Sequence, residues 1–500
     1  MLSGSRIVWY RSGKMLQFGG GERVLLEGLR CLGELGADVR LLLNEPVHSA
    51  TGAFFSAHHS KVSALDGFSF DDDVAAQRTR REGAARDDAV RDDDAAAQRT
   101  LRDGATAPRF VPRVRMLRRT LAALRPDVII AESPVECRYL WLYSLGGRIA
   151  LPPVVTFMHA SPFQFADDAT KYALAFRRHF ADIHAADPVY RETIPAQQLP
   201  MTTAQRARLE AECVALRAGV RMSRLAFVLS DKNRREVERL YGIDRVSVHC
   251  PGGFRRAALD AAPIATPMPA ALPDAFAGLR GPVLLSVCRL IAKKRVDVLL
   301  RALAALVRRN ARSTATLVVV GEGPQRPGLE QLAAALGIGE RVRFAGFVPE
   351  AELSACYGAA DVFVSADNAD YDLSVMTMLP HGGRIVVSTQ YEIPSGLSSL
   401  RRFFTQCAPN AEAFATAIER ALQTPVVPLN DGDRHELEGL CWESYFFGIA
   451  GAIGRAIGRW ESALHAPALP HAPDAAAAAA PSTVPAAAGG PVRRDTRAAA

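Results

Sequence analysis

The feature that most constrains the fold is a series of apolar, β-branched runs between residues 283 and 389. The runs read VLLSV, TLVVV, VRFAG, DVFVS and RIVVS, and helix-like text separates them. The first three end in Gly, Arg or Pro. Near-continuous apolar strands alternating with helices are typical of a parallel sheet covered on both faces, with ligand loops where the strands end. The second half therefore predicts an α/β domain.

The first half repeats this rhythm. A short strand is expected over 6–10, a glycine-rich loop over 18–22, a helix over 23–35 and a second strand over 39–43, which together make a βαβ unit. Gly20 and Gly21 lie where this loop meets the helix, and free N–H groups at a helix start favour anions. Further strands are expected at 126–131, 153–159, 225–229 and 246–250, with a helix over 204–222. The aromatic and basic stretch 170–182 is expected to form core helices or, alternatively, an acceptor- or membrane-facing element.

Composition shifts mark the domain boundaries. We expect an N-terminal, acceptor-side Rossmann-like domain over 1–253, a linker over 254–278, a C-terminal nucleotide-sugar-binding domain over 279–440, a crossover helix over 441–462 and a disordered tail over 463–500. Residues 66–104 contain a duplicated unit, DDDVAAQRT and DDDAAAQRT, with almost no large apolar side chains. Such a segment cannot bury a core, so we expect a low-complexity insertion.

Charge and cysteine usage limit the class of protein. The 500 residues carry a formal net charge of +7, a mild excess that suits anionic ligands or acidic lipid but gives no reason to expect nucleic acid. The 8 cysteines are scattered without metal-type spacing, which favours a reducing cytoplasm. No signal peptide or membrane-spanning run is recognised. We expect a cytoplasmic location, with peripheral contact to the inner membrane surface as an open alternative.

Several loops have a recognisable order. CRLIAKKR (288–295) follows the first strand of the second half, GEGP (321–324) follows the next, and GFV (346–348) follows the third. This order and spacing resemble the nucleotide-sugar half of family 4 (group 1) retaining glycosyltransferases, which have the GT-B fold of two Rossmann-like domains facing across a cleft. The resemblance implies that one set of residues binds the donor: Gly20, Gly21, Arg289, Lys294, Gly321, Gly323, Phe347 and Val348.

The sequence departs from the family where two glutamates normally lie eight positions apart. Ala369 and Thr377 occupy these positions. Asp370 or Asp372 is expected to replace the first carboxylate, and Thr377 to keep one hydrogen bond to the ribose. By the same resemblance, Leu373 and Ser374 lie at a helix start beside the phosphate, and His159 lies close to the reacting sugar.

Two functions follow from this pattern. The first is a retaining glycosyltransferase that moves a hexose from a nucleotide-sugar donor to a glycan or lipid-linked acceptor in cell-surface polysaccharide assembly, without a metal or other cofactor. Its catalytic residues would be His159, Asp370 and Asp372. The second is a catalytically inactive binding or scaffold protein of the same fold, and a third option is a sugar-phosphate-synthesising enzyme with a phosphorylated acceptor. The sequence does not specify the donor sugar, the base, the acceptor or the oligomeric state.

Overall fold

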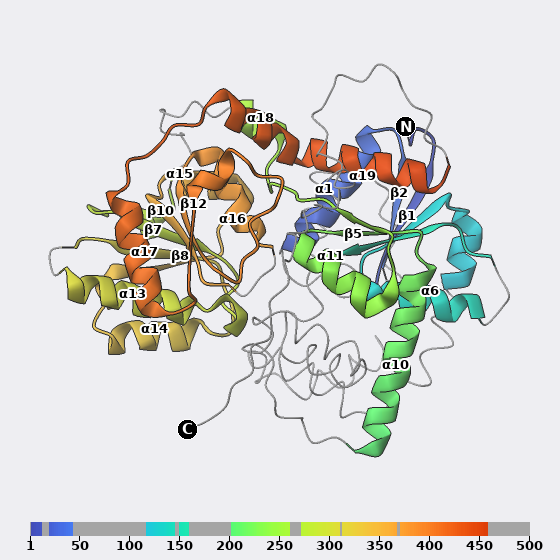
Figure 1. Cartoon of the computed structure of the whole chain (residues 1–500), viewed down its shortest axis with the longest axis horizontal. Helices are drawn as coiled ribbons and strands as arrows, with labels where there is room; N and C mark the ends of the chain where they lie inside the picture. Colours follow the sequence, from blue (N-terminus) through green and yellow to red (C-terminus); the bar gives the residue numbers. More distant parts are fainter. Residues whose placement is uncertain are drawn as a thin grey trace, which may run out of the picture. The chain divides into compact units, whose positions relative to one another are not determined.

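The computed structural model describes residues 2–12, 20–43, 117–145, 150–159, 202–260, 272–310, 313–367 and 371–458. These residues form two parallel six-stranded sheets, ordered β2-β1-β3-β4-β5-β6 and β12-β11-β10-β7-β8-β9 (Figure 1). The predicted α/β class is confirmed. The insertion 66–104, the stretch 170–182, Ala369, Asp370 and the tail 463–500 lie outside the described residues.

The first sheet has helices on both faces. Its strands are β1 (Arg6–Arg11), β2 (Asp38–Leu43), β3 (Val128–Ala131), β4 (Val154–Met158), β5 (Leu225–Val228) and β6 (Val246–Val248). Its helices include α1 (Gly20–Glu34), α6 (Pro134–Leu145), α10 (Thr203–Met222) and α11 (Asp231–Val237). Alternate residues of β1 enter opposite cores: Ile7 and Trp9 pack with α1, whereas Val8 and Tyr10 pack with α6 and α10. This alternation is the period of a strand buried on both faces.

The second sheet has the same construction. Its strands are β7 (Val283–Val287), β8 (Thr316–Val320), β9 (Val342–Gly346), β10 (Val362–Ser365), β11 (Arg384–Ser388) and β12 (Phe404–Cys407). Its helices include α13 (Val296–Arg309), α14 (Arg326–Ala335), α15 (Glu350–Gly358), α16 (Leu373–Met378) and α17 (Ala411–Gln423). Helices α13 and α17 share one core with Leu284 and Val386, and α16 shares the other with Leu285 and Val387.

Each sheet contains one topological switch point, where the strand order reverses. In the first sheet β1 lies between β2 and β3, so the chain turns back between β1 and β3. In the second, β7 lies between β8 and β10, so the switch point is between β7 and β10. Ligands of open α/β sheets bind at the carboxyl ends of the strands at such points. A ligand site is therefore expected in the loops after β1, β3, β7 and β10.

The last two helices join the two halves of the described chain. Helix α18 (Asp431–Leu440) leads into α19 (Trp442–Ala456), whose Trp442, Phe446 and Ile449 are buried in the first sheet's core with α1. The sequence predicted this helix to extend to residue 462; the described helix ends at Ala456, and residues 459–462 lie outside the description.

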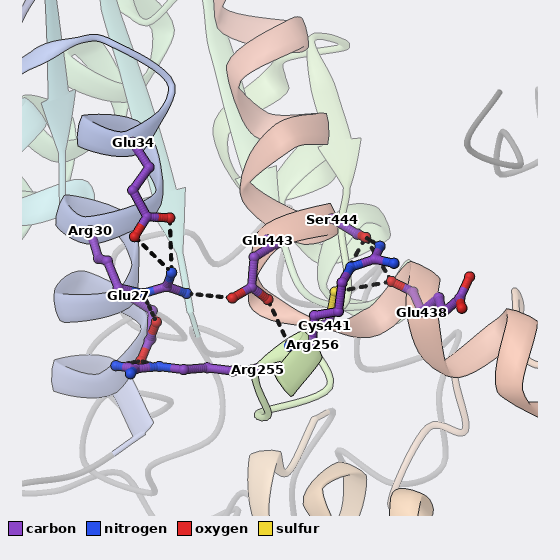
Figure 2. Close-up of polar contacts among 9 residues, drawn as sticks. All are labelled: Glu27, Arg30, Glu34, Arg255, Arg256, Glu438, Cys441, Glu443 and Ser444. Carbon is purple, nitrogen blue, oxygen red and sulfur yellow. Dashed lines mark hydrogen bonds and ion pairs between the residues drawn. The ribbon is translucent and has the colours of Figure 1, made fainter. Parts of the chain in front are cut away.

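A polar network ties α19 to α1 and to α12 (Arg256–Asp260) (Figure 2). Arg30 of α1 pairs with Glu443 at 2.9 Å, and the other carboxylate oxygen of Glu443 accepts the Arg256 N–H at 2.9 Å. Arg255 pairs with Glu27 of α1 at 2.7 Å. This network fixes the point where the chain re-enters the first domain.

All eight cysteines are free thiols. Among the described residues, no helix combines the length and apolar character needed to cross a lipid bilayer.

Candidate functional site

The loops at the second switch point meet in a compact charged cluster. Lys294 follows β7, and Asp367 and Asp372 follow β10. The Lys294 Nζ lies 2.5 Å from Asp367 Oδ2 and 3.1 Å from Asp372 Oδ2. We call these three residues the second-sheet cluster. Its position is the one that the strand order predicts for a ligand site.

Burial strengthens the charge interactions within the second-sheet cluster and shifts the pKa values of its members. Asp367 and Asp372 are almost fully buried, and Lys294 is largely buried. Burial alone would lower the pKa of Lys294, but the two carboxylates raise it well above its usual value. Burial would raise the pKa of Asp372, yet Lys294 and the Ser374 N–H together hold it below the usual range. Fully ionised, the cluster carries one positive and two negative charges, and Asp367 Oδ1 has no hydrogen-bond partner among the described residues.

Asp372 also begins helix α16. Its side chain accepts the Ser374 N–H at 3.0 Å as the N-cap, which leaves Leu373 as the first helical residue. An N-cap carboxylate satisfies one of the free N–H groups of a helix start. Asp372 therefore faces the interior and joins Lys294 to the helix that the family resemblance places beside the donor.

Thr377 lies on the buried side of the same helix. Its hydroxyl donates to the Leu373 carbonyl at 2.8 Å. A Cβ on Gly253 would come within 2.5 Å of this hydroxyl oxygen, so the loop that closes the first domain lies directly against it. The hydroxyl proton of Thr377 is thus used within α16, and the role of Thr377 toward ribose stays a prediction.

The loop after β7 separates its two predicted donor-binding cations. Arg289 is exposed, whereas Lys294 is drawn into the second-sheet cluster. Arg295 has a left-handed backbone with φ of 48°, which is uncommon for a residue other than glycine. Its guanidinium donates to Gln390 Oε1 at 2.6 Å. This side-chain bond anchors the left-handed residue within the loop.

Gly321 and Gly323 have a packing reason for being glycine. A Cβ on Gly321 would lie 1.9 Å from the Cys288 carbonyl oxygen, and one on Gly323 would lie 2.5 Å from that of Leu290. The Leu290 N–H donates to the Glu322 carbonyl at 2.8 Å, which holds the two loops together. These glycines allow their loop to pack closely against the backbone of the loop that carries Lys294. Their direct contact with a donor stays a prediction.

Phe347 and Val348 follow β9 and differ in exposure. Phe347 is 64% exposed, whereas Val348 is buried. Gly346 has a φ of 71°, which turns the chain at the strand end. The Phe347 side chain is accessible and the Val348 side chain is not, and contact of either residue with a donor stays a prediction.

A second charged cluster occupies the switch point of the first sheet. Arg11 ends β1, Glu22 lies in the first turn of α1, and Glu132 follows β3. Arg11 bonds Glu22 at 2.5 Å and Glu132 at 3.3 Å. The Trp9 indole N–H also donates to Glu132. Burial raises the pKa of Glu132 to about 8 even though Arg11 and Trp9 act to lower it.

Two more residues complete this first-sheet cluster, which we define as Arg11, Glu22, Glu132, Glu136 and His159. Glu136, in the first turn of α6, accepts the Ser12 N–H at 2.6 Å and the hydroxyls of Ser12 and Ser133. His159 follows β4. Both of its ring nitrogens are buried and have no hydrogen-bond partner among the described residues. Burial, and secondarily Arg11, lowers its pKa to about 3, so the imidazole is neutral near pH 7.

The predicted site residues are thus only partly brought together. Lys294, Asp372, Leu373 and Ser374 meet at the second switch point, and His159 lies at the first. Gly20 and Gly21 form the start of α1, beside Glu22. Sequence reasoning missed Arg11, Glu22, Glu132, Glu136 and Asp367. Most of them directly follow a strand or open the next helix, and that position was the available signal.

Comparison with known proteins confirms the resemblance. Residues 281–424 match the family model described as "Glycosyl transferases group 1", so the second-sheet cluster lies inside the matched segment. A GDP-mannose-dependent alpha-(1-6)-phosphatidylinositol monomannoside mannosyltransferase of Mycolicibacterium smegmatis is 41% identical over 98 residues, or 18% of this chain and 25% of the relative. A D-inositol 3-phosphate glycosyltransferase of Frankia alni is 33% identical over 191 residues, or 36% of this chain and 42% of the relative. The chain thus spans less than half the length of these curated relatives.

A solved structure extends the likeness to nearly the whole chain. The lipopolysaccharide outer core galactosyltransferase WaaB superposes with a TM-score of 0.54 at 13% identity, covering 90% of this chain and 99% of that one. At 13% identity the match shows the fold alone, and it confirms the predicted GT-B architecture.

Proposed function

We propose that the protein is a retaining glycosyltransferase that transfers a hexose from a nucleotide-sugar to a glycan or lipid-linked acceptor in cell-surface polysaccharide assembly. The group 1 match over residues 281–424 and the GT-B fold support a glycosyltransferase. The single observation that carries the proposal is the second-sheet cluster. It lies at a topological switch point, inside the matched segment and on the loops that the family uses for the donor.

Sugar transfer from a nucleotide donor builds negative charge on the departing diphosphate, so cations are needed near it. Lys294 uses two directions for Asp367 and Asp372, which leaves its third N–H for a phosphate oxygen. The two aspartates offset the positive charge of Lys294. We therefore assign most of the neutralisation of the diphosphate charge to the exposed Arg289 and to backbone N–H groups at the start of α16. We infer that these groups, rather than a metal ion, meet the leaving group.

Retention of configuration suits a cluster of this kind. Front-side displacement, in which the leaving phosphate helps to deprotonate the acceptor, needs no enzyme nucleophile. Asp372 then acts by positioning Lys294 and the α16 N-terminus, which is compatible with its burial. The absence of a glutamate at 369 does not oppose this mechanism.

One observation favours the inactive alternative. Thr377 replaces the glutamate that commonly bonds ribose, and its hydroxyl proton is committed to Leu373. A protein that kept the fold but lost its ribose partner would bind nucleotide weakly and serve as a binding subunit. Hydrolysis of a sugar nucleotide by the purified chain separates the two functions.

Calorimetry with UDP, GDP and ADP tests the proposed donor site. Arg289→Ala is expected to weaken binding of the preferred nucleotide by about 1.5–3 kcal/mol, the range for a hydrogen bond to a charged group. Lys294→Gln, which keeps polar partners for both aspartates, is expected to weaken it by a similar amount. Arg301→Ala removes an exposed arginine from α13 and serves as the matched control. Equal affinity in the parent, Arg289→Ala and Lys294→Gln would remove these residues from the site.

A further inference from the structure

We propose that Arg217 and Arg221, which we call the arginine pair, form a binding site for a phosphate group at the amino ends of the first sheet's strands. The inference goes beyond the proposed transfer reaction and does not depend on it. It is carried by the close approach of two positive charges, by the hydrogen-bond donors that they leave unused and by their place in the fold.

The arginine pair lies far along the chain and the sheet from the donor loops. Arg217 and Arg221 belong to the last two turns of α10, which ends just before β5. Both side chains contact the carbonyl of Tyr241 in the π-helix η1 (Glu238–Gly242), which ends just before β6. Open α/β sheets usually bind ligands at the carboxyl ends of their strands, so a site here is separate from those loops.

Two guanidinium groups lie side by side at this place. Arg221 Nε donates to the Tyr241 carbonyl oxygen at 2.8 Å, and Arg217 Nε donates to the same oxygen at 3.4 Å. A Cβ on Gly242 would lie 2.7 Å from Arg221 Nη2 and 3.2 Å from Arg217 Nη2, so the two terminal nitrogens lie next to one point above this glycine. Gly242 is exposed and has no side chain to cover that point.

The charges of the arginine pair meet no carboxylate in the described part of the chain. Of the two acidic residues that flank Tyr241, Glu238 pairs with an arginine of α11, and Asp244 is exposed and forms no ion pair with a described residue. Burial, and then the charge of Arg221, lower the pKa of Arg217. The carbonyl at a helix end carries only a partial negative charge. A bound anion would offset the remaining repulsion between the two guanidinium groups.

The unused donors match a phosphate. A guanidinium has five N–H groups in a planar fork, and each arginine spends its Nε–H on Tyr241. The Nη groups of both have no hydrogen-bond partner among the described residues. Arginine forks bind phosphate through parallel hydrogen bonds, and a phosphate monoester carries about −1.5 to −2 charges at pH 7, enough to balance two arginines. Arg245 adds positive charge beside the pair, because its guanidinium donates to the Arg221 carbonyl at 3.1 Å.

Calorimetry of the full-length protein with inorganic phosphate and with pyrophosphate, at constant ionic strength, tests the site. We expect Arg217→Gln and Arg221→Gln each to weaken the binding seen in the parent about tenfold or more. Arg217→Lys keeps the charge but loses the fork, so it should also weaken binding. Arg224→Gln is the matched control, because Arg224 is an exposed arginine just after α10 that donates to another carbonyl, that of Ala456, at 3.3 Å. Circular dichroism checks that each variant is folded.

Sedimentation with vesicles distinguishes a free phosphate from a lipid headgroup. The two preparations are phosphatidylcholine alone and phosphatidylcholine with phosphatidic acid, whose headgroup is a phosphate monoester. Calorimetric binding that is lost in both arginine-pair variants supports a soluble ligand. Sedimentation that needs phosphatidic acid and is lost in the same variants supports the site with a lipid as the source of the phosphate.

Four results overturn the inference. These are no binding of either soluble probe or of phosphatidic acid vesicles, binding that is unchanged in the arginine-pair variants, an equal loss in Arg224→Gln, and a signal that belongs to the donor loops. The last is recognised with Arg289→Ala, because the proposed donor site also binds phosphates. A signal that disappears in Arg289→Ala and persists in the arginine-pair variants comes from the donor site. Failure of the phosphate site and failure of the donor site are therefore read from different variants.

Discussion

Replacing Asp372 by asparagine or by alanine separates its two roles. Asparagine is as good an N-cap as aspartate, so Asp372→Asn keeps the bond to the Ser374 N–H and removes only the charged contact with Lys294. Alanine removes both. The pair of variants therefore measures the ion pair and the cap one at a time.

The expected magnitudes follow from the contacts. Lys294 keeps Asp367 at 2.5 Å, so no buried charge is left alone, and the loss in Asp372→Asn is that of one charged hydrogen bond, about 1.5–3 kcal/mol. Alanine adds the loss of the cap, about 0.5–2 kcal/mol, for a total of about 2–5 kcal/mol. Because the pKa of Asp372 is lowered in the folded protein, its contribution is present above the unfolded pKa of about 3.9 and fades as pH falls through the folded value.

Urea unfolding followed by circular dichroism at pH 7 and at pH 3 measures these losses. Asp297→Asn, a change in the first turn of α13, is the control and should stay within about 0.5 kcal/mol of the parent. Equal stability of the asparagine and alanine variants would show that the cap contributes nothing. Parent-like stability of Asp372→Asn would show the same for the ion pair.

Two further predictions concern backbone and packing. Gly28→Ala should destabilise the protein by about 1–3 kcal/mol, because a Cβ there would lie 2.5 Å from Trp9 and 2.9 Å from Phe446. On the same helix, a Cβ at Gly33 would meet no described atom within 4 Å. Gly33→Ala should therefore stabilise the protein by about 0.5–1 kcal/mol. Thermal melts of the two variants check this, and similar shifts in both would refute the close α1–α19 packing. Arg295→Gly should be more stable than Arg295→Ala by about 1–2 kcal/mol, because both lose the same side chain but only glycine adopts φ of 48° without strain. Urea midpoints of these two variants decide it, and a more stable alanine variant would contradict the left-handed backbone.

Most strands and the order of the motifs could be predicted from the sequence because most buried strands are apolar runs. The strand β12 was missed, because it reads FTQC and is only partly buried. Helix bounds were also close: a helix predicted over 204–222 is Thr203–Met222. The charged clusters could not be predicted in the same way. Lys294 lies 73 positions from Asp367, and Arg11 lies 121 positions from Glu132. Such pairs meet only because the strand order reverses between β1 and β3 and between β7 and β10, and strand order is set by long-range packing rather than by local pattern.

The local sequence pattern was least informative where the same residue type can be required for two different physical reasons. The Gly-x-Gly of Gly321 and Gly323 is shared by phosphate-binding loops and by closely packed loops, and the close approach to Cys288 and Leu290 accounts for it here. Arg295 is the converse case. It has the left-handed backbone conformation that is uncommon outside glycine, although nothing in its residue type indicates this.

The central claim is that the chain transfers sugar from a nucleotide donor held at the second sheet. The direct measurement is an NMR time course of the parent and Arg289→Ala with UDP-glucose, UDP-galactose, GDP-mannose and ADP-glucose, each with a neutral hexoside acceptor. We predict release of nucleoside diphosphate from one of these donors by the parent, formation of a glycoside with the donor's anomeric configuration, and strong loss of both in Arg289→Ala. Inverted product, or release that is unchanged in Arg289→Ala, would contradict the proposed mechanism and site, and no release from any donor would favour the binding protein.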